Sequence, residues 1–232
     1  MFSQHFLLDV ETVKIYVKEK LNVFDKITNL EAQEIGDGNI NYVFRVWDGN
    51  KSLIIKQADK LLRQSLREID SSHNKIEASM LKFYNEIVSD YVPKLYLYDP
   101  IMWVIVMEDI SSYKNLRNAL LNRNIIPNLA DNITSFIVNT TLLTSDLVMD
   151  SFIKKENVVN FINKEMCKIT EDLVFTEIVI DYKNRNIITK ENLSFVKEEL
   201  YENENLIFEV AKLKNSFMNN PQALIHGDLH TG

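Results

Sequence analysis

The stretch Pro221-Gln-Ala-Leu-Ile-His-Gly-Asp-Leu-His-Thr-Gly232 places an apolar triplet directly before His-Gly-Asp. Residues 223–225 predict a short buried strand, and His226-Gly227-Asp228 predicts a loop with one carboxylate at the end of that strand. A carboxylate held in this way can accept the proton of a substrate hydroxyl, as the base of a phosphoryl transfer does. A turn with a solvated Asp is the alternative, because Asp and Gly are common in turns. The rest of the chain favours the first interpretation.

The composition is that of a globular protein with a sizeable core. The chain has 232 residues, of which 46% are hydrophobic and 25% charged, enough for one large domain or two small ones. The formal net charge of -7 argues against nucleic acid or an anionic membrane as a partner. The single cysteine, Cys167, cannot form an internal disulfide, and the apolar run 101–107 is too short to span a bilayer. No segment resembles a secretion signal, so we expect a cytoplasmic location.

Three antiparallel strands are predicted in succession near the amino terminus. Residues 31–35 are extended in character, residues 40–47 alternate between apolar and other side chains, and residues 52–57 form the third strand. Asp48-Gly49 between the last two is a strong hairpin turn signal.

Gly36-Asp37-Gly38-Asn39 forms a loop between the first two of these strands. Glycines at alternating positions let backbone N–H groups approach phosphate oxygens closely. The loop has only part of the glycine-loop pattern of kinases, and it lacks the Lys-Ser/Thr of a P-loop. A plain hairpin turn is therefore the alternative.

Lys56 lies inside an apolar strand, on the same face as Ile54. A lysine there costs free energy unless it is paired, although an edge-strand lysine that reaches solvent is an alternative. The segment 74–88 has apolar residues at helical spacing, and its Glu77 points toward packed protein, where a carboxylate needs a cation. We therefore expect a Lys56–Glu77 pair, the arrangement that steadies the phosphate-gripping lysine of kinases.

Two further strands, 94–98 and 102–107, are predicted on either side of a turn at Asp99-Pro100. The second strand opens into Glu108-Asp109-Ile110, which could offer backbone C=O and N–H groups to an adenine edge. The compatible alternative is a buried strand that leads into a helix near Tyr113, with a serine at 111 or 112 as its N-cap.

Helices are predicted over residues 9–21 and in most of the chain after Leu116. Thr170-Glu171-Asp172 is interpreted as a helix start. The order of elements predicts an α+β fold of the two-lobed, protein-kinase-like type. Its N-lobe, residues 1–109, has a five-stranded antiparallel sheet with one helix, and residues 110–232 form an incomplete, mainly helical C-lobe.

Several phrases of the sequence resemble the 5-methylthioribose kinase family, which belongs to the aminoglycoside-phosphotransferase and choline-kinase branch of this fold. The resemblance runs from about residue 30 onward and is carried by residues 34–44, 53–57, 76–79, 107–109, Cys167-Lys-Ile-Thr-Glu-Asp-Leu-Val-Phe-Thr176 and 222–232. It implies phosphorylation of the 1-hydroxyl of methylthioribose in methionine salvage, with ATP and Mg²⁺, by a homodimer.

The resemblance also implies roles for individual residues. Asp228 is the base and contacts the sugar substrate, Lys56 holds phosphates, and Glu77 supports Lys56. The loop Gly36-Asp37-Gly38-Asn39 covers the nucleotide, and Glu108-Asp109-Ile110 face adenine.

The sequence also departs from that family. Its members continue with acidic residues that hold magnesium and with arginines that bind the sugar, and no metal ligands are predicted within these 232 residues. Because metal ions neutralise the charge that develops on the phosphoryl group, we expect an amino-terminal fragment that is inactive alone and exposes apolar surface. The alternatives are a kinase of the same branch for an aminoglycoside, choline or homoserine, and a non-catalytic nucleotide-binding pseudokinase.

Overall fold

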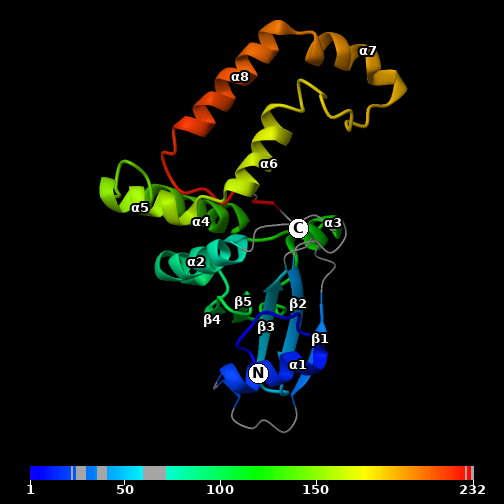
Figure 1. The fold of residues 1–232 in the computed structure, drawn as a ribbon. Coiled ribbons are helices and arrows are strands. Elements are labelled where there is room, and N and C mark those ends of the chain that lie inside the picture. The colour runs from blue at the N-terminus through cyan, green and yellow to red at the C-terminus, as the bar shows by residue number, and fades with distance from the viewer. Residues whose placement is uncertain (22, 25–29, 36–40, 60–71, 228, 231–232) are drawn as a thin grey trace. The chain divides into compact units, whose positions relative to one another are not determined.

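The computed structural model describes residues 1–21, 23–24, 30–35, 41–59, 72–227 and 229–230, and Figure 1 shows their helices and strands. The chain divides into two compact units, Met1–Val148 with Ile225–Gly232, and Met149–Leu224. Each unit is considered by itself below. The predicted lobe boundary after residue 109 is a different division of the chain, and it stays a prediction.

The first unit is built on a five-stranded sheet in which every neighbouring pair is antiparallel, as predicted. The order across the sheet is β1-β2-β3-β5-β4. The strands are β1 (Glu31–Glu34), β2 (Asn41–Trp47), β3 (Ser52–Ala58), β4 (Leu95–Asp99) and β5 (Val104–Glu108). The predicted hairpin turn between β2 and β3 is present: Gly49 has φ +92°, and Asp48 N–H donates to Lys51 C=O at 3.2 Å. Such a φ is accessible to glycine at little cost.

One face of the sheet carries the core of this unit. Helix α1 (Val10–Lys20) begins at Asp9, whose carboxylate accepts hydrogen bonds from two backbone N–H groups of the first turn. The helix packs its apolar side against the sheet (Figure 1). The buried core residues are Phe2, Leu8, Val13, Tyr16, Val17, Phe24, Leu30, Phe44, Val46, Leu53, Ile55, Met102, Val104 and Val106. Because side chains alternate along a strand, Arg45 of β2, Ser52, Ile54 and Lys56 of β3, and Ile105 and Met107 of β5 face away from this core.

Gln57 fastens the amino-terminal segment to the sheet. Its side chain is fully buried; its Oε1 accepts a hydrogen bond from Leu8 N–H at 2.8 Å. Its Nε2 donates to the carbonyls of Phe6, at 2.8 Å, and Met102, at 3.0 Å. A buried amide with all these partners fixes the start of the chain against β3.

The first unit has three further helices. In the sequence, α2 (Ser72–Ile87) lies between β3 and β4, and α3 (Leu116–Leu121) and α4 (Leu129–Leu143) follow β5. The expected helix start near Tyr113, with a serine N-cap, is wrong. Tyr113 N–H instead donates to Ile110 C=O in a turn, and Asn115 caps α3 by accepting a hydrogen bond from Asn118 N–H.

The second unit is helical, with α5 (Ser151–Phe161), α6 (Lys164–Phe175), α7 (Leu193–Val196), α8 (Glu204–Asn219) and two short helical turns, η3 (Lys190–Asn192) and η4 (Lys197–Tyr201). The expected helix start at residues 170–172 is wrong, because these residues lie inside α6. Asn163 is the N-cap, and Asp172 accepts hydrogen bonds from Tyr182 and Lys183 instead of capping a helix.

Within the described residues, no helix has the length and apolarity that a membrane crossing requires.

Candidate functional site

Lys56 and Glu77 form the ion pair that the sequence predicted. Lys56 Nζ donates to both carboxylate oxygens of Glu77, at 2.6 Å and 2.8 Å. The lysine comes from β3 and the glutamate from the second turn of α2. Both side chains are half-buried, with 23% of Lys56 and 32% of Glu77 exposed. The pair therefore has solvent access, as contact with a ligand requires.

The pair leaves Lys56 able to bind a further group. An ammonium has three N–H donors, and Glu77 accepts two of them. The carboxylate fixes the position of the ammonium and offsets its charge when no ligand is present. An incoming anion, such as a phosphate oxygen, can take the remaining donor at a position that is already set.

The strands beside Lys56 give this face of the sheet an apolar surface. The register pairs Lys56 with Val43 of β2 and with Ile105 of β5, and it pairs Ile54 with Met107. Val43, Ile54 and Met107 are half-buried. These strands can accommodate a ligand that has a flat apolar part and an anionic part. The apolar part would lie along the strands, and the anionic part would contact Lys56.

The three residues that were expected to face adenine lie where β5 ends, and their side chains are placed differently. Glu108 is the last residue of β5, and its carboxylate accepts a hydrogen bond from Lys94 N–H at 3.1 Å. The Ile110 side chain is exposed. The Asp109 side chain is buried, with 4% exposed, and turns toward β2 and β3. Any contact of Asp109 with a base would therefore come from its backbone.

Asp109 is held by groups that the sequence reasoning missed. Ser52 Oγ donates to Asp109 Oδ2 at 2.5 Å, and Arg45 Nε lies 2.6 Å from the same oxygen as an ion pair without hydrogen-bond alignment. Ser111 N–H donates to Asp109 Oδ1 at 2.9 Å. Burial by itself would raise the pKa of Asp109, but the Ser52 and Ser111 hydrogen bonds and the Arg45 charge outweigh it and lower that pKa. The sequence did contain a signal for this ion pair, because Arg45 is a cation inside an apolar strand, as Lys56 is, and such a cation needs an acidic partner.

Other expected site residues lie outside the described part of the chain. These are Gly36, Asp37, Gly38 and Asn39 of the expected nucleotide loop, and Asp228. Their roles stay predictions.

The approach to Asp228 is described as far as Gly227, which has φ +80°. The ring of His226 stands edge-on to the Phe136 ring of α4, with centroids 6.3 Å apart. Phe136 packs in the same way against Tyr84 of α2, at 5.8 Å. Rings at these distances attract each other. An aromatic series thus joins the helix of Glu77 to the His-Gly-Asp loop.

The expected strand at residues 223–225 is wrong. These residues have no regular secondary structure, and 56% of the Ile225 side chain is exposed. Three apolar residues do not make a strand without a ladder partner, and the described strands pair only with one another.

No metal site is formed by the described residues. Among them, no three His, Cys, Asp or Glu side chains come together in a way that could hold a metal ion. No catalytic step is therefore assigned to a metal on these residues.

Comparison with known proteins shows which kinases this chain is similar to in sequence. No protein-family model matches the chain. Methylthioribose kinase of Bacillus cereus is 38% identical over 225 residues, which is 96% of this chain and 56% of the relative. Its counterpart in Geobacillus sp. is 39% identical over 218 residues, or 92% of this chain and 54% of the relative. The chain is homologous to the methylthioribose kinases. It spans slightly more than half the length of these relatives.

Solved structures agree on the fold. An ethanolamine kinase from Plasmodium vivax matches 99% of this chain and 60% of its own, with a TM-score of 0.51 and 17% identity. A spectinomycin phosphotransferase, solved with ADP and spectinomycin, matches 98% of this chain and 65% of its own, with a TM-score of 0.52 and 14% identity. At such low identity the likeness shows the fold alone. The predicted α+β, kinase-like fold class is confirmed.

Proposed function

We propose that the protein to which this chain belongs is an ATP-dependent kinase that phosphorylates the 1-hydroxyl of 5-methylthioribose in methionine salvage. The homology to methylthioribose kinases supports the substrate. The observation that carries the proposal is the half-buried Lys56–Glu77 ion pair, which places a fixed ammonium on the face of the sheet opposite the α1 core. A kinase needs such a group for the α- and β-phosphates of ATP.

In the proposed reaction, Lys56 binds phosphate oxygens, and Glu77 holds Lys56 in position. The backbone of residues 108–110 faces the adenine, and the loop of Gly36, Asp37, Gly38 and Asn39 covers the phosphates. Asp228 accepts the proton of the sugar's 1-hydroxyl while the oxygen of that hydroxyl forms a bond to the γ-phosphorus. The bond from that phosphorus to the β,γ-bridging oxygen breaks, and ADP leaves.

Three further features belong to this proposal. Magnesium dependence follows from the requirements of phosphoryl transfer, although the described residues do not assemble a site for the ion. A homodimer follows from the family resemblance. A cytoplasmic location is supported by the single cysteine, Cys167, which has no internal disulfide partner.

The test is release of ADP by the complete product of the gene that encodes this chain. The substrates are 5-methylthioribose, choline, homoserine and an aminoglycoside, each with ATP and magnesium. We expect turnover with 5-methylthioribose and a loss of about 10²- to 10⁴-fold in kcat for Asp228→Asn, the range of a general base. Turnover of another acceptor instead would establish a different kinase of the branch. ATP binding with no turnover of any acceptor would establish a pseudokinase.

A further inference from the structure

Arg45, Ser52 and Asp109 form a polar cluster around the buried Asp109 carboxylate, here called the strand-end anchor. Arg45 belongs to β2, Ser52 belongs to β3, and Asp109 directly follows the last residue of β5. Ser52 Oγ and Arg45 Nε lie 2.5 Å and 2.6 Å from the same carboxylate oxygen of Asp109. The other oxygen accepts the Ser111 N–H. Both oxygens of this carboxylate are thus engaged within the protein.

The strand-end anchor lies on the same face of the sheet as Lys56. Ser52 and Lys56 are four residues apart on β3, so their side chains point the same way, roughly 13 Å apart along the strand. Arg45 pairs with Ile54, which lies between them on that face. A ligand with phosphates at Lys56 that extends along these strands therefore reaches the strand-end anchor with its other end.

The backbone beside the strand-end anchor needs support that the sheet does not give. The β3–β5 ladder ends with the pair Leu53–Glu108, so Asp109 and Ile110 lie beyond it. The carboxylate of Asp109 ties this segment back to β2 and β3. Hydrogen bonds to a base require donors and acceptors held at a fixed position, because small misplacements weaken binding strongly.

We propose that Arg45 and Ser52 are positioning residues for the nucleobase. They act through the Asp109 carboxylate, which holds the backbone of Asp109 and Ile110 where it can bind adenine, and none of the three side chains touches the base. The inference rests on the proposed function, since it takes ATP as the ligand.

The test separates the base end of the ligand from its phosphate end. ATP, adenosine and inorganic tripolyphosphate are titrated calorimetrically into the 232-residue chain and into its Ser52→Ala and Arg45→Gln variants. We expect both variants to bind ATP and adenosine about tenfold more weakly and to bind tripolyphosphate within twofold of wild type. Ser194→Ala and Arg117→Gln, at exposed positions of α7 and α3, serve as matched controls and should bind all three as wild type does.

Each outcome bears on the proposal. Retained tripolyphosphate binding shows that a variant is folded, and Arg45→Lys, which keeps the charge, should recover part of the adenosine affinity. Variants that bind adenosine as tightly as wild type would overturn the inference. An equal loss of adenosine and tripolyphosphate would also overturn it, because the role would then be structural. A wild-type chain that binds neither ATP nor tripolyphosphate would contradict the proposed function itself, and this inference with it.

Discussion

Glu77 accepts two hydrogen bonds from Lys56 across 21 positions of sequence, at 2.6 Å and 2.8 Å, and so joins α2 to the centre of the sheet. If this contact fixes the ammonium for phosphate binding, its loss should weaken nucleotide affinity more than it weakens the fold. About a quarter of Lys56 and a third of Glu77 are exposed, so solvent screens the pair in part and reduces its contribution to stability.

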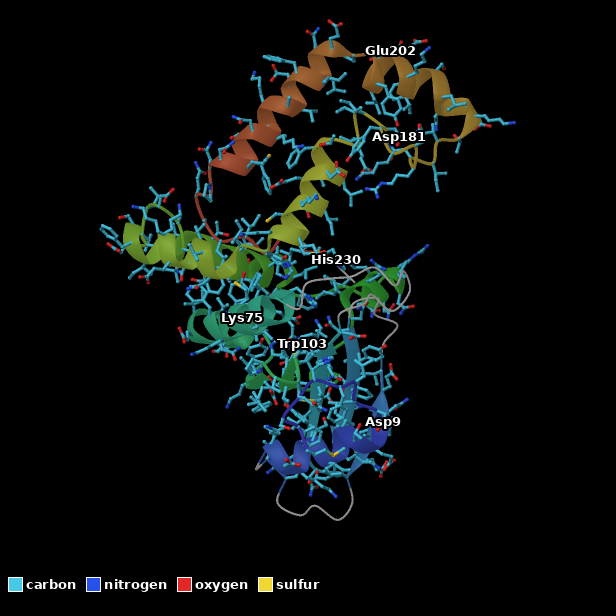
Figure 2. All side chains as sticks on the ribbon, viewed as in Figure 1. Asp9, Lys75, Trp103, Asp181, Glu202 and His230 are labelled. Carbon is cyan, nitrogen blue, oxygen red and sulfur yellow. The ribbon has the colours of Figure 1, made fainter. Side chains whose placement is uncertain are left out.

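Glu77→Gln keeps the size of the side chain and removes its charge. We expect ATP to bind about tenfold more weakly, because Lys56 loses the charge that orients it, while the melting temperature falls only moderately, because the amide still offers Lys56 an oxygen acceptor. Fluorescence titration with an ATP analogue and a thermal melt measure the two effects. Lys75→Gln is the control on the exposed face of the same helix, where Figure 2 labels Lys75. A Glu77→Gln variant that binds ATP as wild type does would refute a supporting role for Glu77.

Gln57→Leu tests the attachment of the amino-terminal segment. The substitution leaves Leu8 N–H and the carbonyls of Phe6 and Met102 without their buried partner. Each unsatisfied buried group costs about 1–3 kcal/mol, so we expect the free energy of unfolding to fall by about 2 kcal/mol or more. Urea denaturation followed by circular dichroism measures it. Gln33→Leu, at an exposed position of β1, is the control and should change the free energy of unfolding by less than about 0.5 kcal/mol. If the two variants lost the same free energy of unfolding, the buried hydrogen bonds of Gln57 would not be the cause.

Acid should weaken the second unit through Asp172. Hydrogen bonds from Lys183 and Tyr182 lower the pKa of Asp172 from 3.8 to about 2. A carboxyl whose pKa is lower in the folded state stabilises that state above its unfolded pKa, and this contribution is lost as the pH falls through the folded value. We therefore expect the thermal stability to drop between about pH 4 and pH 2. Asp172→Asn should flatten this part of the profile, whereas Glu198→Gln, at an exposed position, should not. Parallel profiles for wild type and Asp172→Asn would contradict the expectation.

Local pattern and the cost of buried charge were enough to predict the sheet and its central ion pair. Alternation of side chains identified the strands, and Lys56 needed a partner because it lies in an apolar strand. The same reasoning applied to Arg45 would have found Asp109. The orientation of Asp109, however, depends on Ser52, 57 positions away. Such a contact leaves no periodic signal in the sequence.

The errors have local causes. Residues 223–225 are apolar, but a triplet has too few positions to show a period, and strand formation depends on a partner. Asn115, not a serine at 111 or 112, caps α3, because Asp109 holds Ser111 N–H in a turn. Residues 170–172 resemble a helix start in composition, but they lie inside α6, whose N-cap is Asn163. In the two helix errors, the residue that decides the outcome lies outside the predicted pattern.

The contact of Lys56 with the triphosphate is tested most directly by calorimetric titration of ATP and of adenosine into the wild-type chain and Lys56→Met. Methionine keeps most of the length of the unbranched side chain and removes its charge. We predict that Lys56→Met binds ATP at least tenfold more weakly than wild type and binds adenosine within twofold of it. An unchanged affinity for ATP in Lys56→Met would contradict the proposal that this lysine holds the phosphates.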